Sequence, residues 1–386
     1  MSVKGRCSRL GFLFLSGLTL IGCNGGGGER LFNAMDVDVV STDGSGNPTE
    51  LLITDLGKDW FACGGDSKII RVNLSGDILW AFDQDTYEID GAHNADLNLS
   101  EDQMIISDAC NNRVLVIDYP DGNIIWDSRV DCPELNLQRP NDANFLGDGI
   151  GHGNILITLR DEDWVVEVDP SHCNGLPDDG EIVWDFGVRG DSRADKALED
   201  PDRLLMPYNA DSLPNGNVII ADGGTPVLGA PGRIIEIDYA SKQIAWIYRQ
   251  SRDCIARGVQ GSACPGLGWV RDADVECDDP ACNTGMVVAT GTHQSFGILR
   301  DLNEAPPPGE TIPRGREVPY VVQVGEGFCY DTDLVPRWND DDNQGLGFFL
   351  VSNHGPEFMG GNWLRVVPVD ADAFDPDRDW ELRGSQ

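Results

Sequence analysis

Basic residues are scarce in this chain. It contains 28 lysines and arginines against 65 aspartates and glutamates, which gives a formal net charge of −37 at pH 7. A surface with such an excess of negative charge repels nucleic acid and anionic lipid and keeps a protein soluble. We therefore expect no nucleic-acid partner, and we interpret most of the acidic residues as a solvated surface.

Long hydrophobic runs are missing beyond the first residues. The apolar stretch from Leu10 to Ile21 follows Lys4, Arg6 and Arg9. It is too short to span a bilayer comfortably and has the charge pattern of a secretory signal. We expect the protein to be exported.

The apolar stretch ends in Leu20-Ile21-Gly22-Cys23, which resembles the lipobox of bacterial lipoproteins. The resemblance implies cleavage before Cys23, lipidation of its thiol and attachment to a bacterial membrane, and Asn24 favours the outer membrane. The alternatives are an ordinary secretory signal or a short membrane anchor. We expect a signal peptide at 1–22, a lipidated, glycine-rich tether at 23–33 and one domain at 34–386.

The spacing C-x-x-C, typical of zinc and redox sites, is absent from the eleven cysteines. Export permits disulfides instead. Cys277 and Cys282 are close enough to staple a hairpin tip, and Cys254 and Cys264 could close one loop. Without Cys7 and Cys23 nine cysteines remain, so at least one of a further set should be unpaired: Cys63, Cys110, Cys132, Cys173 and Cys329.

Helical periodicity is absent as well, and short runs rich in Val and Ile alternate with turn residues such as Asp121-Gly122 and Asn215-Gly216. A short acidic motif recurs six times ahead of these runs. Its copies are Thr54-Asp55, Asn94-Ala95-Asp96, Asp142-Ala143-Asn144, Asn209-Ala210-Asp211, Asp272-Ala273-Asp274 and Asp331-Thr332-Asp333. A tryptophan marker follows four of them, at Trp80, Trp126, Trp184 and Trp246, and we place the last at Trp380.

Such a unit of roughly 40–65 residues, with four short strands and about six copies, is typical of a β-propeller. We predict an all-β, six-bladed propeller of four-stranded blades, in which the motif opens each innermost strand and the tryptophan packs between blades. A pair of β-sandwiches is the alternative, but it would not repeat phased Asp and Trp residues. The blades are expected near 53–83, 92–129, 141–188, 208–250, 271–327 and 330–383. Either Met35–Val40 adds an outer strand to the last blade, or that blade closes with its own strand around Trp380.

The repeated acidic residues should form a ring around the propeller axis: Asp55, Asp96, Asn144, Asp211, Asp274 and Asp333. One interpretation is structural, with each side chain capping backbone N–H groups of its own turn. The other is a tentative metal site, because converging oxygens suit Ca²⁺. No cofactor is otherwise required.

Three of the five histidines should lie on one face of the disc, because the start of the first strand and the end of the second meet there. They are His93, His293 and His354, and Arg160 and Arg271 fall on the same face. Imidazole suits proton transfer and nucleophilic attack, and guanidinium suits oxyanions. The alternative is that these side chains are hydrogen-bonded rim residues.

The phrases "HNADLNLSEDQMIISDACNNRVLVIDYPDGNIIW" and "YNADSLPNGNVIIADGG" with "GRIIEIDYASKQIAW" resemble the bacterial arylsulfate sulfotransferase family. The resemblance implies an exported six-bladed propeller that moves a sulfuryl group between phenols through a sulfated histidine. It makes His93 the candidate nucleophile, with His293 or His354 as the fallback. Arg160, Arg271 and Asn94 become candidate substrate contacts. The sequence departs from the family where Asn141, Tyr208, Arg271 and Tyr330 stand at or beside blade openings.

Two other classes compete with this enzyme. One is a non-catalytic binding or scaffold lipoprotein at the cell surface. The other is a quinoprotein dehydrogenase, which six units and the lack of a vicinal cysteine pair disfavour. The expected partners are a small phenolic or sulfated molecule, if the protein is an enzyme, and a membrane through the lipid anchor.

Overall fold

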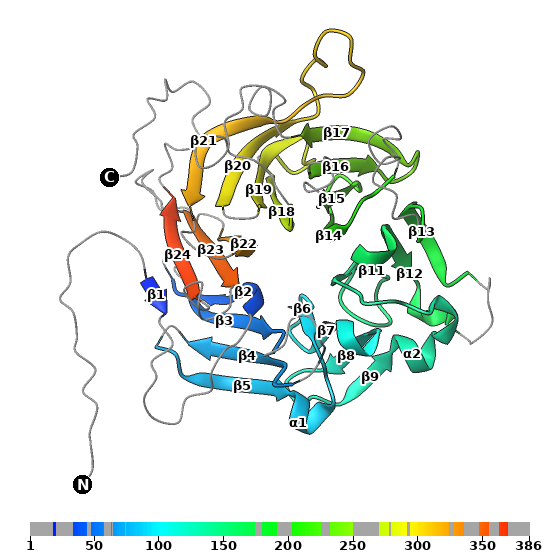
Figure 1. The fold of residues 1–386 in the computed structure, drawn as a ribbon, viewed down its shortest axis with the longest axis vertical. Helices are drawn as coiled ribbons and strands as arrows, with labels where there is room; N and C mark the ends of the chain where they lie inside the picture. The colour runs from blue at the N-terminus through cyan, green and yellow to red at the C-terminus, as the bar shows by residue number, and fades with distance from the viewer. Residues whose placement is uncertain are drawn as a thin grey trace, which may run out of the picture.

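The computed structural model describes residues 18–20, 34–44, 48–57, 63, 65–73, 75–173, 180–190, 203–224, 232–249, 270–277, 279–291, 294–323, 328–335, 347–354 and 363–369. These residues form an all-β propeller of four-stranded antiparallel blades around a common centre (Figure 1). The predicted fold class is therefore confirmed as an all-β propeller built from four-stranded blades.

Five blades follow one another along the chain, each running from its innermost to its outermost strand. The first comprises β2 (Ala34–Thr42), β3 (Pro48–Asp55), β4 (Lys68–Asn73) and β5 (Ile78–Asp83). The second comprises β6 (Ala92–Leu97), β7 (Gln103–Asp108), β8 (Arg113–Asp118) and β9 (Ile124–Asp127). The third comprises β10 (Asp142–Phe145), β11 (Ile155–Leu159), β12 (Trp164–Val168) and β13 (Ile182–Gly187).

The fourth blade comprises β14 (Pro207–Ser212), β15 (Val218–Asp222), β16 (Arg233–Asp238) and β17 (Gln243–Arg249). The fifth comprises β18 (Asp272–Cys277), β19 (Thr284–Thr290), β20 (Gln294–Asp301) and β21 (Arg316–Gln323). A further sheet joins β22 (Phe328–Val335), β23 (Gly347–His354) and β24 (Trp363–Val369) to β1 (Leu18–Leu20), which lies within the stretch expected to be the signal peptide.

The first blade begins earlier than the sequence motif predicted. Its innermost strand is β2, so Met35–Val40 belongs to the first blade and adds no strand to the last one. Asp55 ends the second strand, where its Oδ1 accepts a hydrogen bond from the N–H of Gly57 at 3.1 Å. Asp108 and Asp222 hold the same place in their blades, so Asp55 belongs with them and not with the inner ring.

The core lies between neighbouring blades, because the second and third strands bury side chains on both faces. β12 and β15 are buried along their whole length. Two of the marker tryptophans reach the next blade as predicted. The indole N–H of Trp80 donates to the carbonyl of Pro120 at 2.8 Å, and that of Trp184 donates to the carbonyl of Tyr239 at 3.0 Å.

Disulfides link neighbouring blades and close one hairpin within a blade. Disulfides connect Cys63 with Cys110, Cys132 with Cys173, and Cys277 with Cys282. The last is the predicted hairpin staple, whereas Cys254 and Cys264 lie outside the described residues. The three disulfides indicate an extracellular or periplasmic location.

The turns and short helices follow local side-chain chemistry. Gly122 and Gly216 adopt φ values of +79° and +85° in the two turns that the sequence predicted, a conformation that favours glycine. The short α-helices α1 (Gln84–Tyr87) and α2 (Ser128–Asp131) begin beside aspartate caps. The 3₁₀ turns of the described residues span Ala109–Asn111, Pro133–Leu135, Arg160–Glu162 and Pro170–His172. Among the described residues no helix has the length and apolar character needed to cross a bilayer.

Candidate functional site: the axial cavity

Five innermost strands enclose a small cavity of about 40 Å³ at one end of the propeller axis. Each blade from the first to the fifth contributes two consecutive residues from the beginning of that strand. The lining residues are Met35, Asp36, His93, Asn94, Asn141, Asp142, Tyr208, Asn209, Arg271 and Asp272. Because one water needs about 10–15 Å³ measured in this way, the space suits a few waters or a small ion.

Hydrogen bonds between adjacent blades explain the repeated Asx-Ala pair. The Oδ2 of Asp36 accepts from the N–H of Ala95 at 3.0 Å, and the Oδ1 of Asn94 accepts from Ala143 at 3.4 Å. The Oδ2 of Asp142 accepts from the N–H of the next blade's alanine, Ala210, at 3.3 Å.

The structural interpretation placed each ring residue on backbone N–H groups of its own turn, and Asp55 makes such a contact with Gly57. The side chains of Asp36, Asn94 and Asp142, which lie outside the predicted ring, instead cap a backbone N–H of the following blade. Ala95, Ala143 and Ala210 are fully buried at these contacts, where a larger side chain would separate the blades.

The predicted ring residues Asp96, Asn144, Asp211 and Asp274 do lie on innermost strands, but two positions further along than the cavity residues. They connect with one another and with the cavity layer: the Nδ2 of Asn144 donates to Asp211 Oδ1 at 2.9 Å and to Asp142 Oδ2 at 3.1 Å. Asp333 lies on β22, and its side chain is outside the described residues.

Several carboxylates lie close together at the axis, where burial and their mutual repulsion raise their pKa values. Burial, together with the negative charge of Asp96, raises the pKa of Asp36 well above its ordinary value. Burial and the charge of Asp211 do the same to the pKa of Asp142. Burial and the charge of Asp272 raise the pKa of Asp211 to about 7. The axis therefore carries like charges that a proton or a cation would relieve.

Two guanidinium groups flank one aromatic ring at the mouth of the cavity. The Cζ atoms of Arg271 and Arg160 lie 4.8 Å and 5.4 Å from the ring centroid of Tyr208. Cation–π contact of this kind fixes both arginines beside the cavity. Asn141 links the third blade to the fourth, because its Nδ2 donates a hydrogen bond to the carbonyl of Tyr208 at 2.7 Å.

The structure brings together some of the residues proposed for chemistry. His93, Asn94 and Arg271 line the same cavity. Arg160 is not part of the lining, but its guanidinium contacts the ring of Tyr208, which is. His293 lies outside the described residues. His354 ends β23, beside Phe328 in the strand register, and its side chain is not described.

Sequence reasoning named three of the ten lining residues as site residues and missed the other seven, including Asp36, Asp142 and Asp272. The motif itself held the signal, because its first Asx, not its last, is the residue that reaches the cavity in four blades. Tyr208 and Asn141 precede that Asx directly, so their place in the repeat also marked them.

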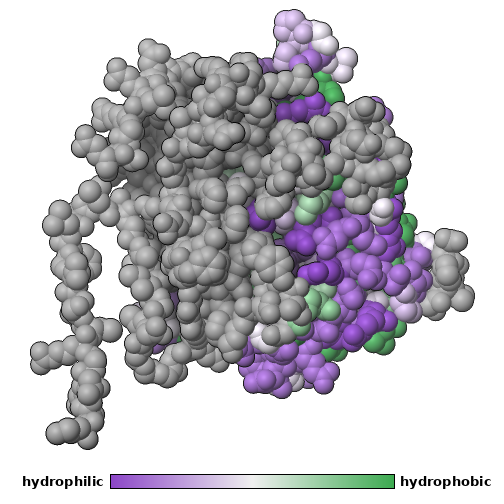
Figure 2. Space-filling model, in the orientation of Figure 1, coloured by the Kyte–Doolittle hydropathy of each residue, from purple (hydrophilic) through white to green (hydrophobic). Residues whose placement is uncertain are grey.

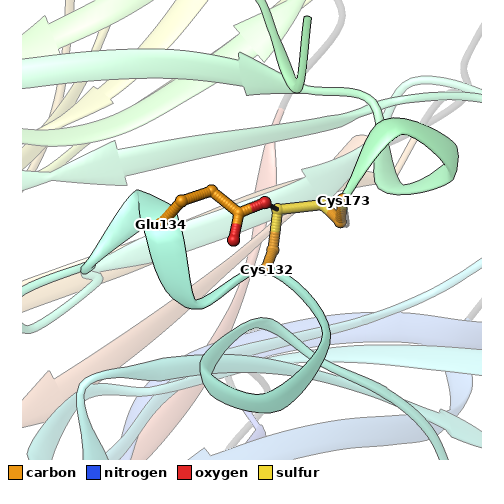
Figure 3. A group of neighbouring side chains, drawn as sticks. All are labelled: Cys132, Glu134 and Cys173. Atoms are coloured by element: carbon orange, nitrogen blue, oxygen red, sulfur yellow. Dashed lines mark hydrogen bonds between the residues drawn. A yellow bond between two sulfur atoms is a disulfide. The ribbon is translucent and has the colours of Figure 1, made fainter. Parts of the chain in front are cut away.

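A second cluster of side chains of the kinds that bind metals lies between the second and third blades (Figure 3). Cys132, Glu134 and Cys173 place their ligand atoms within 4.8 Å of one another. The two sulfurs are joined in a disulfide, so they offer no thiolate to a metal. This group is a covalent link between blades.

Comparisons with known proteins support the fold. No protein-family model and no curated protein matches the sequence. A structure of PorZ, a surface component of the type-IX secretion system of Porphyromonas gingivalis, is 15% identical, with a TM-score of 0.50. It covers 95% of this chain and 43% of its own, so the chain spans less than half of PorZ.

Hydrazine synthase of Kuenenia stuttgartiensis is 9% identical over 90% of this chain and 89% of its own, with a TM-score of 0.46. The WD40 domain of Toxoplasma gondii coronin is 10% identical over 92% and 87%, with a TM-score of 0.44. At these identities the similarities assign the chain to no family, and the resemblance to arylsulfate sulfotransferases stays a prediction.

Proposed function

We propose that this protein is an exported binding or scaffold propeller, tethered to a membrane through Cys23, that holds a divalent cation such as Ca²⁺ at its axis. We also propose that the ring closes as six blades, with the sheet of β22–β24 as the last. The observation that carries the cation proposal is that Asp36, Asp142 and Asp272, from three different blades, line one small cavity.

The chemistry of the cavity favours a cation over an anion. Three carboxylates face one guanidinium there, so the lining carries net negative charge when the carboxylates are ionised. The Oδ1 of Asn209 and the Oδ2 of Asp211 are buried atoms without a hydrogen-bond partner among the described residues. Carboxylate and amide oxygens are the ligands that Ca²⁺ prefers, and a bound cation would satisfy them.

Thermal unfolding tests the proposal. Ca²⁺ added after chelation should raise the Tm at pH 8 and much less at pH 5, because protons compete with the cation for the axial carboxylates at the lower pH. Asp142→Asn should weaken this effect, whereas Asp121→Asn, an exposed carboxylate on an outer turn, should retain it. An equal response of all variants, or none from the unmodified protein, would rule out the axial site.

A second function, sulfuryl transfer, is favoured by a different observation: His93 and Arg271 line the same cavity, with Arg160 beside Tyr208. In such a reaction the imidazole of His93 would attack the sulfur of an aryl sulfate and release a phenolate. A second phenol would then take the sulfuryl group and restore the imidazole. The arginines would hold the sulfate oxygens.

Release of nitrophenol from 4-nitrophenyl sulfate, with and without phenol, distinguishes the two functions. Phenol-dependent release that His93→Ala abolishes would establish the transferase. His152→Ala is the matched control, because His152 lies in an exposed turn between the first two strands of its blade. His293→Ala and His354→Ala complete the set. No release with several phenols would leave the binding function alone.

A further inference from the structure

Apolar side chains are exposed at one repeated place on the outer edge of the propeller. The described residues include nine exposed large hydrophobic side chains, and six of them are the first two residues of three successive outermost strands. These six residues, called here the outer apolar rim, are Ile78 and Leu79 on β5, Ile124 and Ile125 on β9, and Ile182 and Val183 on β13. Hydrophobic residues reach the surface along the right-hand edge in Figure 2, among hydrophilic neighbours.

These strands are also open in their backbone. Within the described part of the chain, β5, β9 and β13 each end their sheet and pair only with the strand inside them. Proteins normally protect such edges with charge, proline or a covering segment, because unpaired N–H and C=O groups accept another strand. An edge that is both open and apolar is unusual on a protein of net charge −37.

The chain itself covers the equivalent edge of the fourth blade. The Pro-rich connection between β20 and β21 returns along β17 (Figure 1). There the N–H of Ile247 donates to the carbonyl of Pro313 at 3.2 Å, and the N–H of Gly315 donates to the carbonyl of Ile247 at 3.1 Å, in a parallel bridge. Gly315 lies so close to Trp246 that a Cβ atom would clash with the indole.

Strand register makes the comparison between blades direct. Ile244 pairs with Ile237 just before a bulge, and Ile124 pairs with Ile117 at the same place in the second blade. Ile244 is partly buried and packs, like Ile312 of the covering segment, against one apolar cluster. Ile124, where no described segment covers the edge, is 45% exposed.

We propose that the outer apolar rim binds an extended, proline-containing basic segment of a partner protein, which adds to the open edges as residues 311–315 add to β17. This inference rests on the binding function proposed above, but it concerns the rim and not the axis. Charge complementarity selects a basic segment, because exposed Asp77 and Asp121 lie in the turns just before β5 and β9. The same net charge of −37 opposes a second copy of this chain and an anionic membrane.

Fluorescence anisotropy with a labelled peptide tests the proposal. The probe has the sequence of residues 308–318, PGETIPRGREV, with its two glutamates replaced by lysine. We expect saturable binding that weakens about tenfold or more when all six rim residues are replaced by serine. The control is Leu99→Ser with Val130→Ser, two exposed apolar residues outside the rim, and it should bind normally.

Several outcomes would overturn the proposal. These are no binding at millimolar peptide, equal binding by the rim variant, and equal binding of a peptide in which aspartate replaces the isoleucine. Sedimentation that shows a dimer lost in the rim variant would make the occupant another copy. Binding to neutral vesicles that is lost in the same variant would make the occupant a lipid surface.

If the six-residue variant does not fold, Ile124→Ser with Ile125→Ser gives the same readout at one edge. Because the axial Ca²⁺ response is measured separately, either proposal can fail alone.

Discussion

The Oδ2 of Asp36 lies 3.0 Å from the backbone nitrogen of Ala95, which is 59 residues away in sequence and in the next blade. Both residues are buried, and the carboxylate also accepts a hydrogen bond from the hydroxyl of Thr54. One side chain therefore joins two blades and at the same time adds negative charge to the axis. These two roles have opposite effects on stability and can be separated by mutation.

We expect Asp36→Ala to destabilise the protein, because the buried N–H of Ala95 would lose its acceptor, at a cost of about 1–3 kcal/mol. Asp36→Asn keeps an acceptor oxygen and removes the charge, so at pH 8 without metal it should equal or exceed the unmodified protein. Urea denaturation of the three proteins measures this difference. Equal losses in both variants would mean that the charge, and not the acceptor, matters.

A buried ion pair should make a larger contribution to the junction of the fourth and fifth blades. Arg300 and Glu236 have no exposed side-chain surface and form two hydrogen bonds, of 2.6 Å and 2.8 Å. Arg300→Met leaves the carboxylate buried and unpaired, which should cost about 3–5 kcal/mol.

The double variant, with Glu236→Met as well, should recover part of that loss, because no lone charge remains. The free energy of unfolding of the single and double variants decides the point. A double variant less stable than Arg300→Met would contradict this account. It would show that the packing of the aliphatic parts of the two side chains contributes more to stability than their charges do.

The fold could be predicted because its signals are local. Val- and Ile-rich runs, Asn-Gly and Asp-Gly turns and the marker tryptophans each depend on a few consecutive residues, and Trp80 and Trp184 lie between blades as expected. The first blade was placed wrongly because Thr54-Asp55 imitates the motif at the end of a second strand. The true opening strand carries Asp36-Val37-Asp38, with valine where the second to fifth blades have alanine.

The site was harder to predict because its geometry depends on contacts between blades. Asp96 and Asn94 are separated by one residue and face the same region, yet only Asn94 lines the cavity. Neither the pairing of Asp142 with Ala210 nor the approach of two arginines to Tyr208 leaves a local pattern. The covering of β17 by residues 311–315 is equally non-local.

Removing disulfides should destabilise the protein according to the length of the loop that each one closes. Cys132 and Cys173 are separated by 41 residues, and Cys277 and Cys282 by 5. The loop-entropy model predicts losses of ~4 kcal/mol for the first pair and ~2 kcal/mol for the second when both cysteines become serine. Denaturation under oxidising conditions measures both losses. A reversed order would show that the short staple stabilises the native state by other means.

The axial carboxylates predict that stability depends on pH in an unusual direction. The pKa of Asp211 is about 7 in the folded protein, against ~3.9 in an unfolded chain, so the folded state binds its proton more tightly. This contribution is complete below about pH 4 and is lost as the pH rises through 7, and the raised pKa values of Asp36 and Asp142 act in the same direction. We expect the Tm without metal to fall between pH 5 and pH 8.

Asp211→Asn should flatten that fall, because the substituted side chain has no proton to lose. Asp148→Asn is the matched control: hydrogen bonds from Ser100 lower the pKa of this half-exposed carboxylate, so it is already ionised throughout the interval. Circular dichroism melts at each pH, in the presence of a chelator, provide the measurement. An Asp211→Asn curve parallel to that of the unmodified protein would show that Asp211 does not take up a proton in this range. The repulsion at the axis would then have to reside in Asp36 and Asp142.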